Sequence, residues 1–173
     1  MVAYHDDEWG CPISDDIALF ERLSLEAFQA GLSWSTILHK REAFVRAFAG
    51  FDLERVSSFD DTDRARLVAD AGIVRNRAKI EATIGNAAAC MEIVATHGSF
   101  STYLADRLNR PAPILPPTAT PDDVRATTAE SDALSADLRR RGFRFVGSTI
   151  VYAFLQSVGL VDDHLPGCYR YRG

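Results

Sequence analysis

Glu26 is an acidic residue inside the apolar stripe of an expected helix, eight residues before Trp34. At 3.6 residues per turn, it shares one helix face with Leu19, Leu23 and Ala30. A carboxylate on that face points into the interior, where burial is costly unless the group is paired, protonated or bound to a ligand. The pattern predicts a pocket in which an acidic group beside an indole binds a flat, cationic or NH-donating ligand. The alternative is a glutamate that pairs with a buried arginine.

His164 and Cys168 form a His-x-x-x-Cys motif near the end of the chain, with a Pro-Gly pair between them. The Pro-Gly pair predicts a tight loop, and imidazole with thiolate is a ligand pair typical of zinc. His5, near the other terminus, is the natural third ligand and would clip the two ends of the chain together. A closed structural site needs four ligands, and Cys11 is the candidate for the fourth. Packed or exposed side chains without a metal are the alternative interpretation.

Composition places the sequence among ordinary globular proteins. Its 173 residues predict one domain over 1–173, and a hydrophobic content of 47% is ample for a core. No apolar run approaches the roughly 20 residues of a membrane span, so no membrane partner is expected. Three cysteines are too few for a disulfide scaffold and favour a reducing, cytoplasmic location. We expect a monomer, because the sequence offers no additional amphipathic surface for a partner.

Helical periodicity dominates the chain and predicts an all-α protein. We expect Ser14 and Ser131 to cap two of the helices, and we expect residues 109–123, which contain five prolines, to form a linker. Residues 143–146 are brief and apolar and could be extended. The expected helices cover 14–30, 33–49, 53–58, 62–71, 76–96, 100–108, 131–141 and 148–158.

The basic segment over 67–84 predicts two consecutive helices, and these could also form a DNA-binding hairpin. The net charge of −5 gives no general attraction to nucleic acid, so any DNA contact must come from a local patch. Here Gly72 lies in a tight turn and is followed by Arg75, Arg77 and Lys79. Such a helix-hairpin-helix would aim backbone N–H groups and a helix N-terminus at a phosphate. An ordinary corner between two helices has the same sequence pattern.

Several sequence blocks occur in one order along the chain, and together they are far more specific than any single motif. The blocks are YHDDEWG at 4–10, LEAFQAGLSW at 25–34, DAGIVRNRAKI at 70–80, SDALS at 131–135, RGFRFVGSTI at 141–150 and DHLPGC at 163–168. This series closely resembles the 3-methyladenine DNA glycosylase I family, over residues 4–168.

The resemblance implies a helix-hairpin-helix DNA glycosylase with a zinc clip that joins the N- and C-termini. It implies excision of N3-methyladenine from alkylated double-stranded DNA in base excision repair, with Glu26 as the central catalytic and base-binding residue. By the motif matches, Tyr4 and Glu26 hydrogen-bond the flipped base, Trp34 stacks on it and Trp9 lines the pocket. The matches further imply zinc ligands at His5, His164 and Cys168, and a DNA-binding hairpin that carries Gly72, Arg75, Arg77 and Lys79.

One departure from the family pattern concerns the start of the chain. Members normally carry a Cys-Gly-Trp segment before the Tyr-His motif, which supplies the fourth zinc ligand and another pocket indole. This chain starts at Met1, immediately before the motif, so we expect a fourth ligand that is missing or substituted by Cys11.

The expected chemistry needs little acid catalysis, because N3-methylation makes the base cationic and the base departs neutral. A pocket that favours the transition state over the duplex can therefore suffice. No lysine is an obvious Schiff-base nucleophile, which predicts a monofunctional hydrolase, and the expected zinc is structural, with Asp163 behind His164. Two rival functions remain open at this point: a non-catalytic binder of alkylated bases and a zinc-dependent hydrolase.

Overall fold

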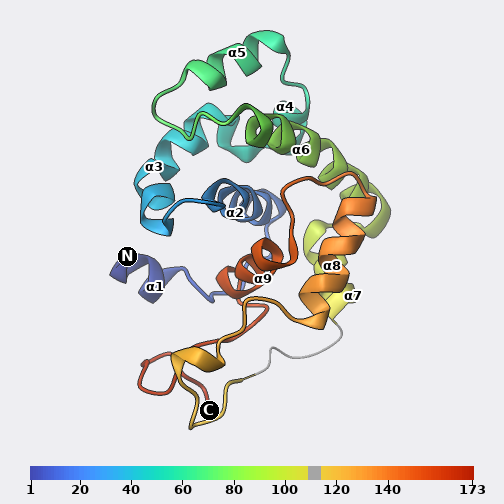
Figure 1. The fold of residues 1–173 in the computed structure, drawn as a ribbon. Coiled ribbons are helices and arrows are strands. Elements are labelled where there is room, and N and C mark those ends of the chain that lie inside the picture. The colour runs from blue at the N-terminus through green and yellow to red at the C-terminus, as the bar shows by residue number, and fades with distance from the viewer. Residues whose placement is uncertain (109–113) are drawn as a thin grey trace.

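The computed structural model describes residues 1–108 and 114–173, and it is helical over these residues, with an isolated bridge between Ile114 and Asp162. The predicted all-α class is confirmed for this part of the chain. Figure 1 shows the arrangement of the helices. They are α1 (Val2–Asp7), α2 (Asp16–Gln29), α3 (Trp34–Ala47), η1 (Ala49–Phe51), α4 (Leu53–Ser57), α5 (Asp61–Ala69), α6 (Arg77–His97), α7 (Phe100–Leu108), η2 (Pro121–Asp123), α8 (Ala129–Arg140) and α9 (Ser148–Ser157).

Helix α2 lies in the middle of the molecule and contacts α3, α6, α7 and α9 (Figure 1). Its apolar residues Leu19, Phe20 and Phe28 have no exposed surface. Burial of this kind, worth roughly 25 cal/mol per Å² of apolar surface, makes α2 the axis of the core. A polar side chain on the same helix, such as Glu26, is therefore held rigidly by its neighbours.

Helices α5 and α6 form a hairpin whose connection spans residues 70–76. Asp60 caps α5 by accepting from the Thr62 and Asp63 backbone N–H groups, and Asn76 caps α6 by accepting from the Lys79 N–H. Side-chain oxygens in this position satisfy backbone donors that the helix itself leaves free. The two caps thus fix where the turn of the hairpin begins and ends.

Helix α9 is strongly apolar and packs against α2 and α8. The turn before it holds Phe145 at a φ of 55°, a left-handed conformation that is rare for a bulky side chain. Asn86 from α6 bonds both backbone groups of Arg144, accepting from its N–H at 2.8 Å and donating to its carbonyl at 3.0 Å. These two bonds hold the turn in place, and residues 143–146 are not extended strand, because no neighbouring strand is present in the described chain.

Two predicted caps are wrong by a few residues. Asp15, not Ser14, caps α2 by accepting from the Ala18 N–H at 2.8 Å. Helix α8 begins after its cap Thr128, and Ser131 is the third residue of the helix, where it completes a capping box with Thr128. Both corrections have the same cause: several neighbouring residues have side chains able to cap a helix, and tertiary packing selects among them.

The predicted linker over 109–123 is only partly visible, since residues 109–113 lie outside the described residues. Its later part contains the short helix η2, which the sequence did not predict. Helix α1 was not predicted either. None of the described helices is both long and apolar enough to cross a membrane.

Candidate active site

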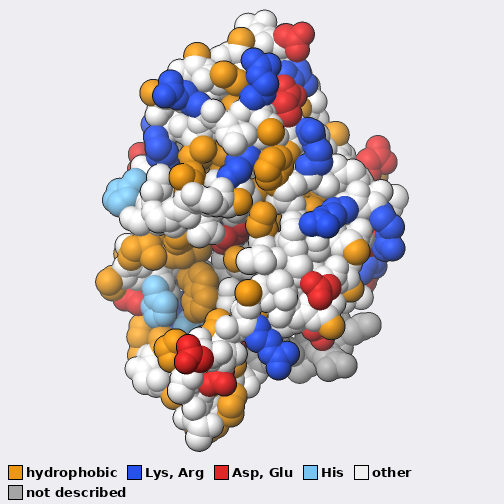
Figure 2. All heavy atoms as spheres, viewed as in Figure 1, with side chains coloured by type: hydrophobic (Ala, Val, Ile, Leu, Met, Phe, Trp, Pro, Cys, Tyr) orange, Lys and Arg blue, Asp and Glu red, His pale blue; other side chains and the backbone are white. Residues whose placement is uncertain are grey.

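A cavity of about 310 Å³ opens where α1, α2, α3 and α9 meet. A volume of this size fits a small flat molecule. Figure 2 shows hydrophobic and histidine side chains around a hollow on the face presented there. The residues that line the cavity include Tyr4, His5, Trp9, Glu26, Trp34 and Gln156.

Glu26 lies in the wall of this cavity with only 5% of its surface exposed. Among the residues that the structure describes, no hydrogen bond or ion pair engages its carboxylate. Burial raises the pKa of Glu26 from the ordinary 4.5 to about 8, and the charge of Arg22 opposes that rise. Arg22 itself bonds to Tyr4 and Glu8, so the alternative of a glutamate paired with a buried arginine is not observed. The carboxyl group is thus available to a ligand.

Aromatic rings form the rest of the wall. The rings of Tyr4 and Trp34 lie 5.4 Å apart at 52°, and the Trp34 Nε1 is buried without a hydrogen-bond partner. Burial is also the main reason that the pKa of Tyr4 rises to about 12, so its hydroxyl stays protonated and able to donate. A planar base can therefore meet an acidic acceptor, a phenolic donor and aromatic faces in one cavity.

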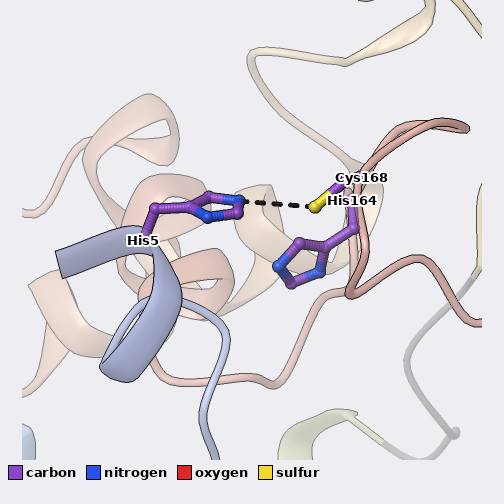
Figure 3. Close-up of side chains that lie close together, drawn as sticks. All are labelled: His5, His164 and Cys168. Atoms are coloured by element: carbon purple, nitrogen blue, oxygen red, sulfur yellow. Dashed lines mark hydrogen bonds between the residues drawn. The ribbon is translucent and has the colours of Figure 1, made fainter. Parts of the chain in front are cut away.

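The structure brings His5, His164 and Cys168 together although 163 positions separate the first from the last in sequence (Figure 3). One ligand atom from each lies within 4.8 Å of the others, and the Cys168 Sγ is 3.5 Å from the His5 Nε2. His5 comes from α1, and the other two come from the C-terminal tail. The predicted contact between the two ends of the chain is therefore present.

The donor atoms in this cluster fit a tetrahedral divalent metal. The Nδ1 of His5 lies 2.8 Å from the Asp6 carboxylate, and the Nδ1 of His164 lies 2.6 Å from the Asp162 carboxylate. Such partners orient the rings and leave each Nε2 free for a metal. The buried His164 Nε2 has no hydrogen-bond partner, as expected for a ligand atom. The cluster could thus hold a metal that accepts imidazole and thiolate ligands.

Two details of the predicted metal site differ from the structure. Cys11 is not part of the cluster, because its Sγ accepts from Arg170 at 3.2 Å. Asp162, not Asp163, contacts His164. The Asp163 carboxylate instead accepts from Tyr152 and from another side chain of α9. A carboxylate directly before a histidine was a reasonable expectation, but the turn directs it to α9.

Trp9 connects the cavity to the metal cluster. Its ring lies 4.7 Å from the His164 ring at 72°, and it stacks on His5 at 5.9 Å and 18°. The same indole lines the cavity. A displacement of Trp9 would therefore alter both the wall of the cavity and the packing around the metal cluster.

The hairpin residues predicted to contact DNA fall into two groups. Arg75 and Arg77 are exposed, whereas Lys79 is buried with 6% of its surface accessible. The Lys79 Nζ donates to the carbonyls of Phe28 and Ala30, at 2.9 and 2.7 Å, and so bonds the end of α2. It does not face outward, because the C-terminal carbonyls of α2 are stronger local partners for a buried ammonium.

Gly72 lies in the turn of the hairpin. Its N–H donates to the Asp70 carboxylate at 2.7 Å, and a Cβ atom at Gly72 would lie 3.1 Å from the Ala43 Cβ. Lys40 donates to the carbonyls of Ala71 and Gly72. The turn is thereby held closely against α3, which leaves little room for a side chain at Gly72.

Sequence reasoning missed the ion pairs that hold α1 in place. Arg22 is buried on α2, and Glu8 accepts from both Arg22 and Arg41. Arg41 also donates to Glu21 at 2.7 Å. An arginine inside an apolar helix indicates a buried ion pair. The sequence does not show which acidic residue is its partner, because Glu8 lies in a separate segment of the chain.

Comparison with known proteins gives consistent matches over nearly the whole chain. The profile of a family described as methyladenine glycosylase matches residues 1–171. The DNA-3-methyladenine glycosylase 1 of Escherichia coli (strain K12) is 45% identical over 172 residues, which cover 99% of this chain and 91% of that protein. A DNA-3-methyladenine glycosylase of Haemophilus influenzae is 42% identical over 167 residues, covering 96% and 90%.

Solved structures agree with these sequence matches. A crystal structure of 3-methyladenine DNA glycosylase I superposes with a TM-score of 0.94 at 42% identity, covering 99% of this chain and 93% of that one. A structure that describes 3-methyladenine recognition by the enzyme from Staphylococcus aureus superposes with a TM-score of 0.93 at 38% identity, covering 99% and 91%. The helical arrangement of this chain is therefore that of these neighbours.

Proposed function

This chain belongs to the methyladenine glycosylase family, and from that premise we propose how its cavity excises N3-methyladenine from alkylated DNA. The predicted family and the predicted activity, a DNA-3-methyladenine glycosylase of base excision repair, are confirmed by the sequence matches. The observation that carries the proposal for the site is the unpaired, buried carboxyl group of Glu26 in an aromatic cavity.

The damaged nucleotide must first leave the base stack, because the cavity cannot reach a base within a duplex. The flipped base then enters between Trp34 and the α1 segment. Stacking on an aromatic face is worth roughly 1–3 kcal/mol per base. Glu26 accepts a hydrogen bond from the exocyclic amine, and Tyr4 donates to a ring nitrogen beside it. In a buried cavity these bonds strengthen, and bases without matching groups leave polar atoms unpaired.

Selective stabilisation of the departing base supplies the catalysis. The N3-methylated base is cationic while attached to the sugar, and the cleavage of its glycosidic bond neutralises it. A cationic base that enters the cavity favours the ionised form of Glu26, and the apolar wall favours the neutral base that departs. Water then completes the hydrolysis at the sugar without a protein nucleophile, as a monofunctional glycosylase requires.

We further propose a structural zinc ion bound by His5, His164 and Cys168. Zinc would link the first helix to the tail, and its ligand set is the kind that zinc prefers. Support comes from the orphan His164 Nε2 and from the carboxylates behind both histidines. The role is to hold α1, which carries pocket residues, rather than to activate water.

For DNA binding we propose the hairpin of α5 and α6, used as a helix-hairpin-helix. Its outward groups are the turn at Gly72 and the exposed Arg75 and Arg77. In Figure 2, Lys and Arg side chains gather over the upper part of the same face as the hollow, over α3, α5 and α6. A basic surface on that face would hold the phosphates while the base enters the cavity. Lys79 contributes indirectly, because it fastens α6 to the end of α2.

The test is the single-turnover release of 3-methyladenine from methylated duplex DNA by the parent protein and by Glu26→Gln. Removal of a charge-assisted hydrogen bond costs about 1.5–3 kcal/mol, so we expect release to slow by roughly 10–100-fold. Glu42→Gln is the matched control, because Glu42 is exposed on α3, away from the cavity. Tight binding of methylated DNA without base release by the parent would instead identify a non-catalytic binder.

A further inference from the structure

The geometry assigns to Arg22 the role of a positioning residue that fixes the hydroxyl of Tyr4 so that its proton points into the base cavity. This inference rests on the proposed function of the cavity and deepens it. The Arg22 Nη1 donates to the Tyr4 hydroxyl at 2.6 Å, and the Arg22 side chain is almost fully buried. The base-binding roles proposed above do not involve this arginine.

The direction of the Tyr4 proton follows from the chemistry of the two groups. A guanidinium has donors and no acceptor, so the Tyr4 oxygen must accept from Arg22. The phenolic O–H lies in the plane of the ring, so its proton cannot point toward Arg22 and takes the opposite in-plane position. Within the described part of the chain, the Tyr4 hydroxyl has no second hydrogen-bond partner. Since Tyr4 lines the cavity, its free proton is left for a ligand.

Arg22 is itself held from behind by a chain of alternating charges. Its Nη2 donates to the Glu8 carboxylate at 3.1 Å, and Glu8 also accepts from Arg41, which donates onward to Glu21 at 2.7 Å. Two arginines and two glutamates balance each other, so the buried guanidinium is compensated. The chain ties α1, which carries Tyr4, to both α2 and α3. Tyr4 therefore has little freedom to turn away from the cavity.

The same bonds explain why Glu26 remains unpaired. Arg22 lies one helical turn before Glu26 on α2, where an arginine and a glutamate ordinarily form an ion pair. Tyr4 and Glu8 occupy its guanidinium instead. The cavity consequently presents a donor at Tyr4 and an acceptor at Glu26. Adenine offers the complementary pair, a ring nitrogen beside an amine, whereas guanine places a carbonyl oxygen where adenine has the amine.

A double-mutant cycle tests whether Arg22 acts through Tyr4. The measured quantities are the single-turnover release of 3-methyladenine and the dissociation constant for free 3-methyladenine. We expect Arg22→Met and Tyr4→Phe each to slow release about tenfold, and the double variant to be no slower than either single variant. Arg140→Met is the matched control, since Arg140 is an exposed arginine on α8 that bonds Asp137 and contacts neither Tyr4 nor Glu8. It should slow release less than threefold.

Multiplication of the two single effects in the double variant would overturn the inference, because Arg22 would then act independently of Tyr4. Arg22→Lys provides a second cycle in case Arg22→Met does not fold, since a lysine keeps the charge but lacks the two-nitrogen fork with which Arg22 bonds Tyr4 and Glu8. In that cycle the same non-additive result is expected. Failure of the proposed function is distinguishable, because the parent protein itself would then release no base.

Discussion

Replacement of Glu26 by glutamine is expected to make the protein more stable at neutral and alkaline pH while it slows base release. The folded state raises the pKa of Glu26 from 4.5 to about 8, mainly because burial disfavours the charged form. The folded chain therefore binds the proton of the Glu26 carboxyl group more tightly than the unfolded chain does. The stability that this protonation contributes is fully present below pH 4.5 and is lost as the pH rises through about 8.

The size of the effect follows from the same pKa values. A difference of this size corresponds to about 5 kcal/mol over the whole titration, and to about 2 kcal/mol between pH 6 and pH 8. Glutamine has nearly the same shape and cannot ionise, so Glu26→Gln loses none of this stability. We expect its advantage over the parent to grow by about 2 kcal/mol from pH 6 to pH 8, or by roughly 6 °C in Tm for a chain of this size.

Denaturant unfolding of both proteins at several pH values from 6 to 8 measures this difference. Every other titratable group is present in both proteins and cancels in the comparison. Glu42→Gln is the control, because the Glu42 side chain is 94% exposed and its replacement should give no pH-dependent difference. A constant gap between the parent and Glu26→Gln over this range would refute the reasoning, since it would mean that Glu26 is ionised in the folded state throughout.

Three further substitutions test the scaffold around the site. Gly159→Ala is expected to lower the free energy of unfolding by about 2–4 kcal/mol, against about 1 kcal/mol for Gly98→Ala, measured by denaturant titration. Both glycines have positive φ, but only a Cβ at Gly159 would meet backbone atoms, the nearest at 2.7 Å, and equal losses would contradict this reasoning. Lys79→Met should lower the free energy of unfolding by about 1–3 kcal/mol, because the buried carbonyl of Phe28 and the half-buried carbonyl of Ala30 lose this donor. Replacement of the exposed Arg77 by methionine should change stability by under about 0.5 kcal/mol and weaken DNA binding instead. Cys168→Ser should reduce bound zinc in metal analysis and lower the Tm, and an unchanged zinc content would remove this cysteine from the proposed ligand set.

The helices were largely predictable because their signals are local. The period of 3.6 residues located α2, α3 and α6, and Asn76 was correctly taken as the start of the long helix α6. Cap identity was less predictable. A serine, threonine or aspartate can act as the cap or as the third helical residue that bonds back to the cap, and only packing distinguishes the two roles.

The burial of Glu26 was predictable for the same reason, since it depends on which face of α2 is apolar. Its lack of a partner was not predictable. Arg22 stands four residues earlier on the same helix, and the sequence alone favours an ion pair between the two. The docking of α1 decides otherwise, because Tyr4 and Glu8 bring a hydroxyl and a carboxylate to the guanidinium.

Lys79 is a second residue whose partners could not be predicted from the sequence. A lysine after a basic turn was expected to face a phosphate, and the local pattern contains nothing against it. Its actual partners are the carbonyls of Phe28 and Ala30, about fifty positions earlier in the chain. Long side chains near a helix start choose among distant partners, and that choice depends on how whole helices pack.

The segment that carries Tyr4, His5 and Trp9 is short, yet it forms one wall of the cavity. A helix of six residues has little stability of its own, so this wall must be held by tertiary bonds. Two sets of bonds hold it: Glu8 binds the arginines of α2 and α3, and His5 reaches the cluster at the tail. Both sets begin within the four residues that follow Tyr4 in sequence. Tyr4 can therefore keep its place opposite Trp34 only while both are intact, which links the proposed zinc to base recognition without giving it any part in the chemistry.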